Sequence, residues 1–337
     1  MSVTAPWQDR RPWLMAEIGV NHDGDEARAA SMIRACAAAG FDAVKFQYWI
    51  VEELLAEQAP NAPYQGDGDQ RELLARLRLD LGQLGRLGVV AAEAGVDFVV
   101  TPDGEQACAD VVSLGPAALK IGSGDCDNPW LLDAASRSGL PLIVSLGMTD
   151  PSETEQIVRR LQGTGELALL HCVSAYPTPL ADAGLAQVTA LARFGTVVGY
   201  SDHTLGIAAP AAALALGARI VEKHVTWDPG APGPDHAASL HLDTAGEWVR
   251  TLRLLHEGLH RDGRSGDERA NRPLVRKGLY AARDLAAGDV LRPDDLRPLR
   301  PLLDGIAASE RDRVVGHGVR RAVPAGGLLH TDDLETR

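Results

Sequence analysis

Cysteines and long apolar runs are scarce in this sequence of 337 residues. The four cysteines, Cys36, Cys108, Cys126 and Cys172, show no CxxC spacing, which argues against a disulfide framework and against a cysteine zinc site. The sequence has no run of roughly 18 apolar residues that would span a bilayer, and residues 1–15 lack the apolar segment of a secretory signal. We therefore expect four small core cysteines in a cytoplasmic protein that does not enter membranes.

Basic side chains are in the minority. The chain has 33 Lys and Arg against 46 Asp and Glu, which gives a net charge of −13. This charge repels the backbone of a nucleic acid and an anionic membrane surface, so we expect neither as a partner. An anionic small molecule would have to be met by local positive charge.

A GxGxxG motif is also missing after the first apolar run, which disfavours a doubly wound dinucleotide-binding fold. Short β-branched runs instead alternate with Ala- and Leu-rich stretches, as in parallel strands covered by crossover helices. The eight runs are 13–20, 42–49, 96–102, 118–124, 141–147, 167–174, 196–202 and 219–226. Eight strand-helix units in about 250 residues predict a closed (β/α)8 TIM barrel, an α/β fold.

The composition changes after the last expected barrel helix. We predict a barrel domain over 1–262, a polar linker over 263–273 and a small, mostly β domain over 274–337, where short apolar pieces are separated by turn signals. Residues 50–80 form an insertion after the second strand, and the polar segment 61–70 is expected to be a loop over the barrel mouth.

Polar residues gather at or just past the C-terminal halves of the eight strands, where barrel enzymes keep their active sites. They are Glu17, Asn21, Lys45, Gln47, Thr101, Lys120, Ser123, Ser145, His171, Ser174, Ser201, His203, Lys223 and His224. One or two such residues are explained by helix capping or by loop hydrogen bonds. Because all eight strands carry them, we predict an active site at this rim.

His203 and His224 follow neighbouring expected strands. Two imidazoles at such positions can share one divalent cation and leave its other positions open to water or substrate. Mn²⁺, Co²⁺, Fe²⁺, Zn²⁺ and Mg²⁺ are all candidates. Two neutral histidines that donate to backbone carbonyls explain the pattern equally well.

Lys45 and Lys120 supply positive charge at the same rim. Together with the hydroxyls of Thr101, Ser123, Ser145 and Ser201 they make a cup suited to a phosphate or carboxylate, although each lysine is also explained by a structural salt bridge. The carboxylates of Glu17, Asp125 and Asp235 are available for proton transfer or for binding hydroxyls. The residues alone therefore predict a metal-assisted reaction on an anionic, phosphorylated small molecule.

Several segments resemble the sialic acid synthase family, the nonulosonate synthases that include N-acetylneuraminate and legionaminate synthases. They are "AEIGVNHDGD" (16–25), "LLHCVSAYPTP" (169–179), "GYSDHTLG" (199–206) and "EKHVTWDPGAPGPDHAASL" (222–240). The segment "LYAARDLAAGDVLRPDDL" (279–296) is similar to the antifreeze-like (SAF) domain of the same family.

The resemblance implies a C–C bond-forming transferase that condenses phosphoenolpyruvate with an N-acetylmannosamine-like aldose to give a nonulosonic 2-keto acid and phosphate. It implies that His203 and His224 bind the metal, with Mn²⁺ the first choice, and that Glu17 and Gln47 lie near the reacting centre. It assigns the phosphoenolpyruvate site to Lys45, Thr101, Lys120, Ser123, Ser145 and Ser201. The sugar is assigned to Ser174, Tyr176 and Asp235, and to Arg300 from the small domain of the other subunit in a domain-swapped homodimer.

Some positions depart from the family pattern. Asp125 stands where the family usually has Glu, a candidate base for the water that attacks C2, and "TPDGE" (101–105) stands where "TPFDE" is common. "SLGM" (145–148) lacks the usual Thr, and "RPLLDGI" (300–306) replaces "RPGxGI". These changes leave two alternatives open: a related phosphoenolpyruvate-dependent synthase that uses a different sugar, and a sugar-binding homologue without turnover.

Overall fold

The computed structural model describes residues 5–8, 11–56 and 69–335. The chain divides into two compact units, residues 1–260 and 261–337, which are described separately. No helix among the described residues has the length and apolar character needed to cross a membrane.

The first unit is a closed barrel of eight parallel strands, in which β1 pairs with both β2 and β8. The strands are β1 (Trp13–Gly19), β2 (Ala43–Trp49), β3 (Asp97–Asp103), β4 (Ala118–Ile121), β5 (Leu142–Ser145), β6 (Leu167–Cys172), β7 (Val197–Asp202) and β8 (Ile220–Thr226). A two-residue strand, β9 (Leu240–His241), pairs in parallel with the end of β8. The expected TIM barrel is confirmed.

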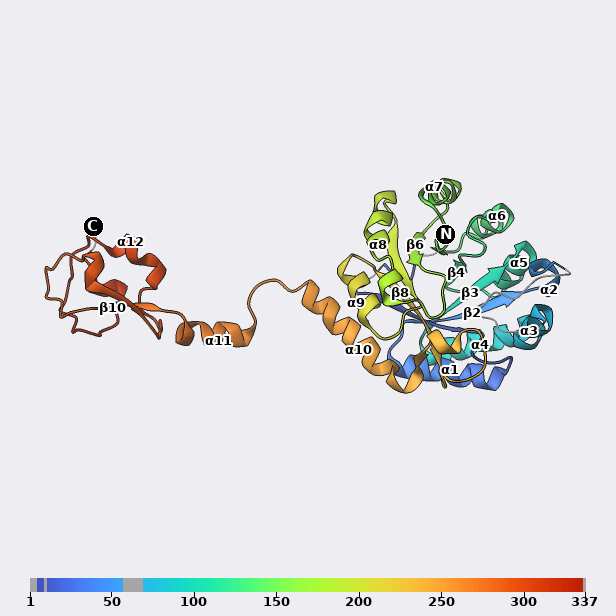
Figure 1. Cartoon of the computed structure of the whole chain (residues 1–337), viewed down its shortest axis with the longest axis horizontal. Coiled ribbons are helices and arrows are strands. Elements are labelled where there is room, and N and C mark those ends of the chain that lie inside the picture. Colours follow the sequence, from blue (N-terminus) through green and yellow to red (C-terminus); the bar gives the residue numbers. More distant parts are fainter. Residues whose placement is uncertain (1–4, 9–10, 57–68, 336–337) are drawn as a thin grey trace. The chain divides into compact units, whose positions relative to one another are not determined.

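Helices surround the strands (Figure 1). They are α1 (Glu26–Ala39), α4 (Leu81–Ala94), α5 (Glu105–Ser113), α6 (Pro129–Arg137), α7 (Pro151–Arg160), α8 (Ala186–Leu191), α9 (Ala208–Ala215) and α10 (Leu242–Leu259). Their ends follow local chemistry: α1 starts at Asp25, whose side chain accepts from the Ala27 and Arg28 amides, and stops at Gly40, which has a positive φ of 92°. Asp80 and Gln83 form a capping box at the start of α4.

Alternation along each strand decides what faces the barrel axis. In β1, Leu14, Ala16 and Ile18 pack with the helices, whereas Trp13 and Met15 belong to the apolar interior. The interior cluster comprises Ala5, Trp7, Trp13, Met15, Ala43, Val99, Ala118, Ile143, Ala168, Leu170 and Ile220. Two residues further along each strand the inward side chain is polar or bears sulfur: Glu17, Lys45, Thr101, Lys120, Ser145, Cys172, Ser201 and Glu222. The barrel therefore has an apolar floor and a polar layer above it.

All four cysteines are buried and unpaired, which confirms that they are small core residues. Cys172 also contributes its sulfur to the polar layer, because it faces inward at the end of β6.

The insertion after β2 contains α2 (Val51–Leu54) and α3 (Gln70–Leu77). Most of the predicted mouth loop, residues 61–68, lies outside the described residues. At its end Asp69 caps α3 by accepting from the Arg71 amide at 2.7 Å. The last residue of the predicted loop, Gln70, is therefore helical.

The second unit begins with α11 (Gly266–Val275), followed by β10 (Gly278–Ala281), β11 (Leu296–Leu299) and α12 (Arg311–Val314). Most of the predicted linker 263–273 is thus helical, because Ser265 caps the helix by accepting from the Glu268 amide at 3.0 Å. Strands β10 and β11 form an antiparallel pair, and isolated bridges connect the remaining segments.

The second unit has its own buried apolar core, which includes Leu279, Leu291, Val319 and Leu329. It also repeats one polar arrangement. Arg283 pairs with Asp295, and Arg321 pairs with Asp333, with the same spacing of twelve residues. Each aspartate in turn accepts a backbone amide from three residues earlier, so segments 283–296 and 321–334 are built alike.

Candidate active site

A cavity of about 420 Å³ opens at the C-terminal ends of the barrel strands. Thirteen of the predicted site residues line it: Glu17, Lys45, Gln47, Thr101, Lys120, Ser123, Ser145, Ser174, Tyr176, Ser201, His203, His224 and Asp235. Leu73, Leu74 and Leu77 of α3 form an apolar part of its wall. The insertion after β2 therefore helps to enclose the cavity.

Two lysines at the bottom of the cavity share one carboxylate. Lys45 Nζ lies 2.8 Å from Glu17 Oε1 and 3.6 Å from Glu222 Oε1, and Lys120 Nζ lies 3.6 Å from Glu222 Oε2. The ammonium groups also donate to hydroxyls, Lys45 to Thr101 at 3.0 Å and Lys120 to Ser145 at 2.6 Å.

The charges in this group set one another's protonation. Burial lowers the pKa of Lys120, whereas for Lys45 the charges of Glu17 and Glu222 outweigh burial and raise the pKa. Burial opposes ionisation of Glu222, but Lys120 and Lys45 lower its pKa below the ordinary value. Burial raises the pKa of Glu17. The two lysine side chains therefore meet at one carboxylate, Glu222, and supply local positive charge that an anion can approach.

The two cavity histidines come from neighbouring strand ends. Their ring centroids are 5.5 Å apart, and the Tyr176 ring packs against both, at 4.2 and 5.9 Å between centroids. His203 Nδ1 donates to the Val173 carbonyl at 2.7 Å. His224 Nδ1 is buried and unbonded within the described structure, 3.6 Å from Asp235 Oδ2. Burial lowers the pKa of both rings, which keeps them neutral.

The carboxyl group of Asp235 is partly protonated near neutrality. Burial, followed by the charge of Glu17, raises the pKa of Asp235 to about 7. Gln47 Nε2 donates to Glu17 Oε1 at 2.7 Å. Glu17 Oε2 is buried and has no hydrogen-bond partner in the described part of the chain.

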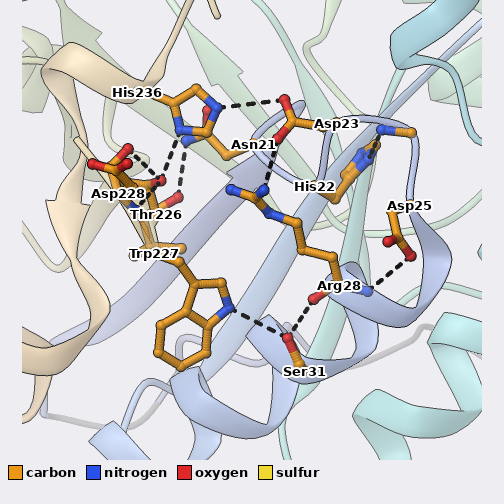
Figure 2. Close-up of polar contacts among 12 residues, drawn as sticks. Asn21, His22, Asp23, Asp25, Arg28, Ser31, Thr226, Trp227, Asp228 and His236 are labelled. Carbon is orange, nitrogen blue, oxygen red and sulfur yellow. Dashed lines mark hydrogen bonds and ion pairs between the residues drawn. The ribbon is translucent and has the colours of Figure 1, made fainter. Parts of the chain in front are cut away.

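A network of polar contacts ties the loop after β1 to the loop after β8, which carries Asp235 (Figure 2). Asn21 Nδ2 donates to the Val225 carbonyl and to Ser239 Oγ, both at 2.9 Å. His236 lies 2.7 Å from Thr226 Oγ1 and 3.5 Å from Asp23 Oδ1, and Asp23 pairs with Arg28 at 2.9 Å. Asn21 therefore connects the loop after β1 to β8 and to the loop that carries Asp235.

Two predicted site residues do not line the cavity. Asp125 lies beyond β4, where its Oδ1 accepts from Asn128 Nδ2 at 2.9 Å. Arg300 belongs to the second unit, directly after β11.

Asn21, His171 and Lys223 lie at or just past the C-terminal halves of their strands, as predicted, but none of them lines the cavity. Lys223 Nζ lies 2.9 Å from Asp202 Oδ2, and His171 Nε2 donates to the Ala183 carbonyl at 2.8 Å while its ring stacks on Tyr200. Both alternate with inward residues and so point to the helix side of the barrel.

Three titratable residues of the cavity wall have no role predicted from the sequence: Glu222, Cys172 and Asp103. Glu222 was detectable by the period of two that puts it on the same face as His224. Cys172 Sγ lies 3.0 Å from Ser123 Oγ, which accepts the Gly147 amide at 3.0 Å.

A larger recess of about 590 Å³ lies at the other end of the barrel. Glycines and apolar side chains form most of its wall, and Asp97 is its one titratable lining residue among those described. The chemistry is therefore concentrated at the C-terminal cavity.

Fold and site together define a barrel enzyme with an anion seat beside a histidine pair. Residues 32–262 match the NeuB family and residues 276–335 match the SAF domain. The chain belongs to the NeuB family, which confirms both the resemblance and the expectation of an enzyme.

Among its relatives, the N,N'-diacetyllegionaminic acid synthase of Legionella pneumophila is 36% identical over 96% of this chain and 94% of its own length. The protein with the same name from Campylobacter jejuni is 33% identical over 91% of this chain and 95% of its own length. The crystal structure of an N-acetylneuraminic acid synthetase from Leptospira borgpetersenii, in complex with citrate, has a TM-score of 0.70 and 30% identity, covering 78% of this chain and 90% of that one.

Proposed function

We propose that this enzyme condenses phosphoenolpyruvate with an N-acetylmannosamine-like 2-acetamido aldose, forming a nonulosonic 2-keto acid and releasing phosphate. The observation that carries the proposal is the single cavity in which two lysines sharing Glu222 lie beside His203 and His224. The names of the relatives, which are synthases of nonulosonic acids, supply the reaction class.

The lysines would hold the anionic groups of phosphoenolpyruvate. Thr101 and Ser145 accept a hydrogen bond from Lys45 and Lys120, so their own O–H groups remain available to donate to a phosphate or carboxylate oxygen. Ser123 and Ser201 line the same cavity and add two more hydroxyl donors.

His203 and His224 would hold a divalent cation, with Mn²⁺ as our first choice and Co²⁺, Fe²⁺, Zn²⁺ or Mg²⁺ as alternatives. The residues present fit this role, because both rings are neutral and His224 Nδ1 is a buried nitrogen without a hydrogen-bond partner in the described structure. Among the described residues, no group of three or more His, Cys, Asp or Glu side chains is arranged so that it could hold a metal ion by itself. When bound, the cation polarises the aldehyde carbonyl of the open-chain sugar.

The sugar would lie against the residues above the lysines. Tyr176, Ser174 and Gln47 offer hydroxyl and amide groups, and Asp235 offers a carboxyl group that exchanges protons near pH 7. Hydrogen bonds from these groups would orient the aldehyde toward C3 of phosphoenolpyruvate. The apolar wall formed by Leu73, Leu74 and Leu77 would limit the access of water to that side.

We also propose that the chain acts as a cytoplasmic homodimer in which the SAF unit of each subunit caps the other subunit's cavity and brings Arg300 to the sugar. This step rests on the family resemblance. A guanidinium group at the mouth would donate hydrogen bonds to the N-acetyl carbonyl of a 2-acetamido aldose.

The test measures phosphate release from phosphoenolpyruvate with a panel of 2-acetamido aldoses, other six-carbon aldoses and five-carbon aldoses, with Mn²⁺ present. Mass spectrometry then identifies the product. The proposal is supported if phosphate is released with a 2-acetamido aldose and the product is a nonulosonic acid with a nine-carbon backbone, with or without further substituents. Release only with an unsubstituted or five-carbon aldose indicates the alternative synthase, and binding by calorimetry without release from any aldose indicates a sugar-binding homologue.

A further inference from the structure

Asp103 is a carboxylate in the cavity wall that the proposed function leaves without a role. It is the last residue of β3 and lies two positions beyond Thr101, so it faces the barrel axis about 6 to 7 Å nearer the mouth. Its side chain is half-buried, and no hydrogen bond or ion pair within the described residues engages its carboxylate.

Charged groups face Asp103 from several elements. Lys45 comes from β2 and Lys120 from β4, on either side of β3, while Glu17 comes from β1 and Asp125 from the turn after β4. Burial, followed by the negative charge of Asp125, raises the pKa of Asp103 to about 7, and the two lysines limit the rise. A carboxylate with such a pKa can both accept and return a proton at neutral pH.

The position of Asp103 also separates it from the histidines. β3 and β7 are four strands apart in a ring of eight and therefore lie across the barrel from each other. His203 and His224 are on the β7 and β8 side, and the ammonium groups of Lys45 and Lys120 extend from β2 and β4 to within 3.6 Å of the Glu222 carboxylate on β8. An aldose held near the histidines would approach phosphoenolpyruvate from one side, which leaves the side facing Asp103 open to a water molecule.

We infer that Asp103 is the base that removes a proton from the water attacking C2 of the phosphoenolpyruvate-derived intermediate. The inference rests on the proposed function, because it names a catalytic residue for that reaction. It replaces Asp125 in this role, since Asp125 turns to Asn128 and does not line the cavity.

The step balances as follows. C3 of phosphoenolpyruvate bonds to the aldehyde carbon, the aldehyde oxygen takes up a proton, and C2 is left electron-poor. The water oxygen bonds to C2 while its proton passes to Asp103. The bond between C2 and the phosphate oxygen then breaks, the electron pair leaves with phosphate, and the C2 hydroxyl loses its proton to form the ketone. Of the two protons that the water molecule supplies, one leaves with phosphate. Asp103 releases the other to solvent, which replaces the solvent proton that the aldehyde oxygen took up.

The experiment compares Asp103→Asn with Asp125→Asn and with Asp127→Asn, a nearby exposed aspartate, in the full chain. For each we measure kcat and both KM values, the pH profile of kcat, and the titration of the carboxyl groups by NMR on protein labelled with ¹³C at aspartate. The NMR titration assigns the Asp103 signal by its loss in Asp103→Asn and does not depend on activity.

For Asp103→Asn we expect kcat to fall by about 100-fold or more with KM for phosphoenolpyruvate changed less than about threefold, as for loss of a general base. In the wild type, kcat should rise with pH through a value near 7, and Asp103→Asn should lose this rise. Asp125→Asn should keep the rise but shift it to lower pH, because one negative charge near Asp103 is gone. Asp127→Asn should behave as the wild type does.

Three results would overturn the inference: an Asp103→Asn enzyme with near wild-type kcat, a loss expressed in KM for the aldose alone, or an Asp103 signal that titrates near 4. A wild type that releases no phosphate with any aldose overturns the proposed function, and the inference falls with it. An active wild type beside an active Asp103→Asn variant overturns the inference alone.

Discussion

His203 and His224 differ in what holds their rings. The Val173 carbonyl fixes the tautomer of His203, because Nδ1 must carry the proton to donate to it, and Nε2 keeps its lone pair. His224 makes no comparable bond among the described residues, and its Nδ1 faces Asp235 at 3.6 Å. If both histidines had only a structural role, we would expect the ring nitrogens of both to be hydrogen-bonded in the same way. His224, whose Nδ1 is unbonded among the described residues, is therefore the stronger indication of a metal site.

We predict that His224→Ala and His203→Ala each lose Mn²⁺ binding by at least about tenfold, because one of two protein ligands is removed. Calorimetric titration of the full chain with MnCl2 measures this without substrate. His330→Ala, in the second unit, serves as the control and should bind Mn²⁺ as the wild type does. Unchanged Mn²⁺ affinity in both cavity variants would refute the metal site.

Asp235 is predicted to make stability depend on pH. Burial raises its pKa from the ordinary 3.8 to about 7, so the folded chain binds this proton more tightly than the unfolded chain does. Below about pH 4 the carboxyl group is protonated in both states, and its burial costs no ionisation energy. As the pH rises from about 4 to about 7, the unfolded chain releases this proton while the folded chain keeps it, so the folded state loses stability. At about 1.4 kcal/mol per pH unit, the full effect is at most about 4 kcal/mol.

Asp235→Asn cannot ionise and should therefore escape this loss. Urea unfolding of metal-free protein at pH 5 and pH 8 measures the effect, and the variant should gain on the wild type by a few kcal/mol at most between the two values. Asp228→Asn, on the exposed part of the same loop, should show no such gain. Parallel pH dependence in the wild type and Asp235→Asn would contradict the assigned burial of a charged carboxylate.

Between elements, the turn after β5 is held very close to β4 and β6. A Cβ atom at Gly147 would lie 2.7 Å from Ser123 Oγ, Cys172 Sγ and Ser174 Oγ. These three side chains come from the ends of two strands, Ser123 after β4 and Cys172 and Ser174 at the end of β6, and they line the cavity. A methyl group at this position must displace at least one of them, since real contacts of this kind are not that short.

We predict that Gly147→Ala lowers kcat/KM by about tenfold or more and costs about 1–3 kcal/mol of stability, as overpacking in a core does. Gly258→Ala is the matched control, because its Cβ atom meets open space in helix α10. It should retain activity and gain stability by about 0.5–1 kcal/mol from helix propensity. Equal activity of the two variants would show that the turn can move without affecting the site.

The eight strands could be predicted because each is buried on both faces and reads as a short apolar run, as in residues 219–226. Which face each polar residue takes could not be read from the runs alone. The facing of a whole strand is fixed once one of its residues is known to face the barrel axis. If His224 faces the axis, Glu222 does too and Lys223 does not. Without such a residue, the pattern predicts Lys223 at the rim and does not single out Glu222.

The directions of side chains beyond the strand ends could not be predicted from the alternation along the strands, because they depend on the conformation of each loop. Asp125 follows a tight turn in which its amide donates to the Gly122 carbonyl at 3.1 Å, and this turn directs its carboxylate to Asn128. Asp103, still inside β3, keeps the inward direction. Helix α11 was missed for a different reason: it buries no residue, so its sequence carries no apolar stripe.

At the level of the whole molecule, the chain consists of two units, each with its own apolar core. The cavity of the first unit already contains the groups proposed for the anion and the cation. The contribution proposed for the second unit is a single guanidinium, Arg300, supplied to another subunit. The question is therefore whether that residue acts on its own chain's cavity or on a partner's.

Mixed dimers of two impaired variants, Arg300→Ala and His224→Ala, distinguish these two possibilities. Arg300→Ala should raise KM for the aldose by about tenfold or more while KM for phosphoenolpyruvate changes little, and His224→Ala should abolish turnover. When the two chains are produced together with different tags and their mixed dimers form at random, an intact cavity meets an intact Arg300 only across the subunit boundary. About a quarter of all cavities are then complete, and activity at low aldose concentration should rise above the mean of the two parent variants. If Arg300 acts within its own chain, no cavity is complete, and the mixture should show only the residual activity of Arg300→Ala.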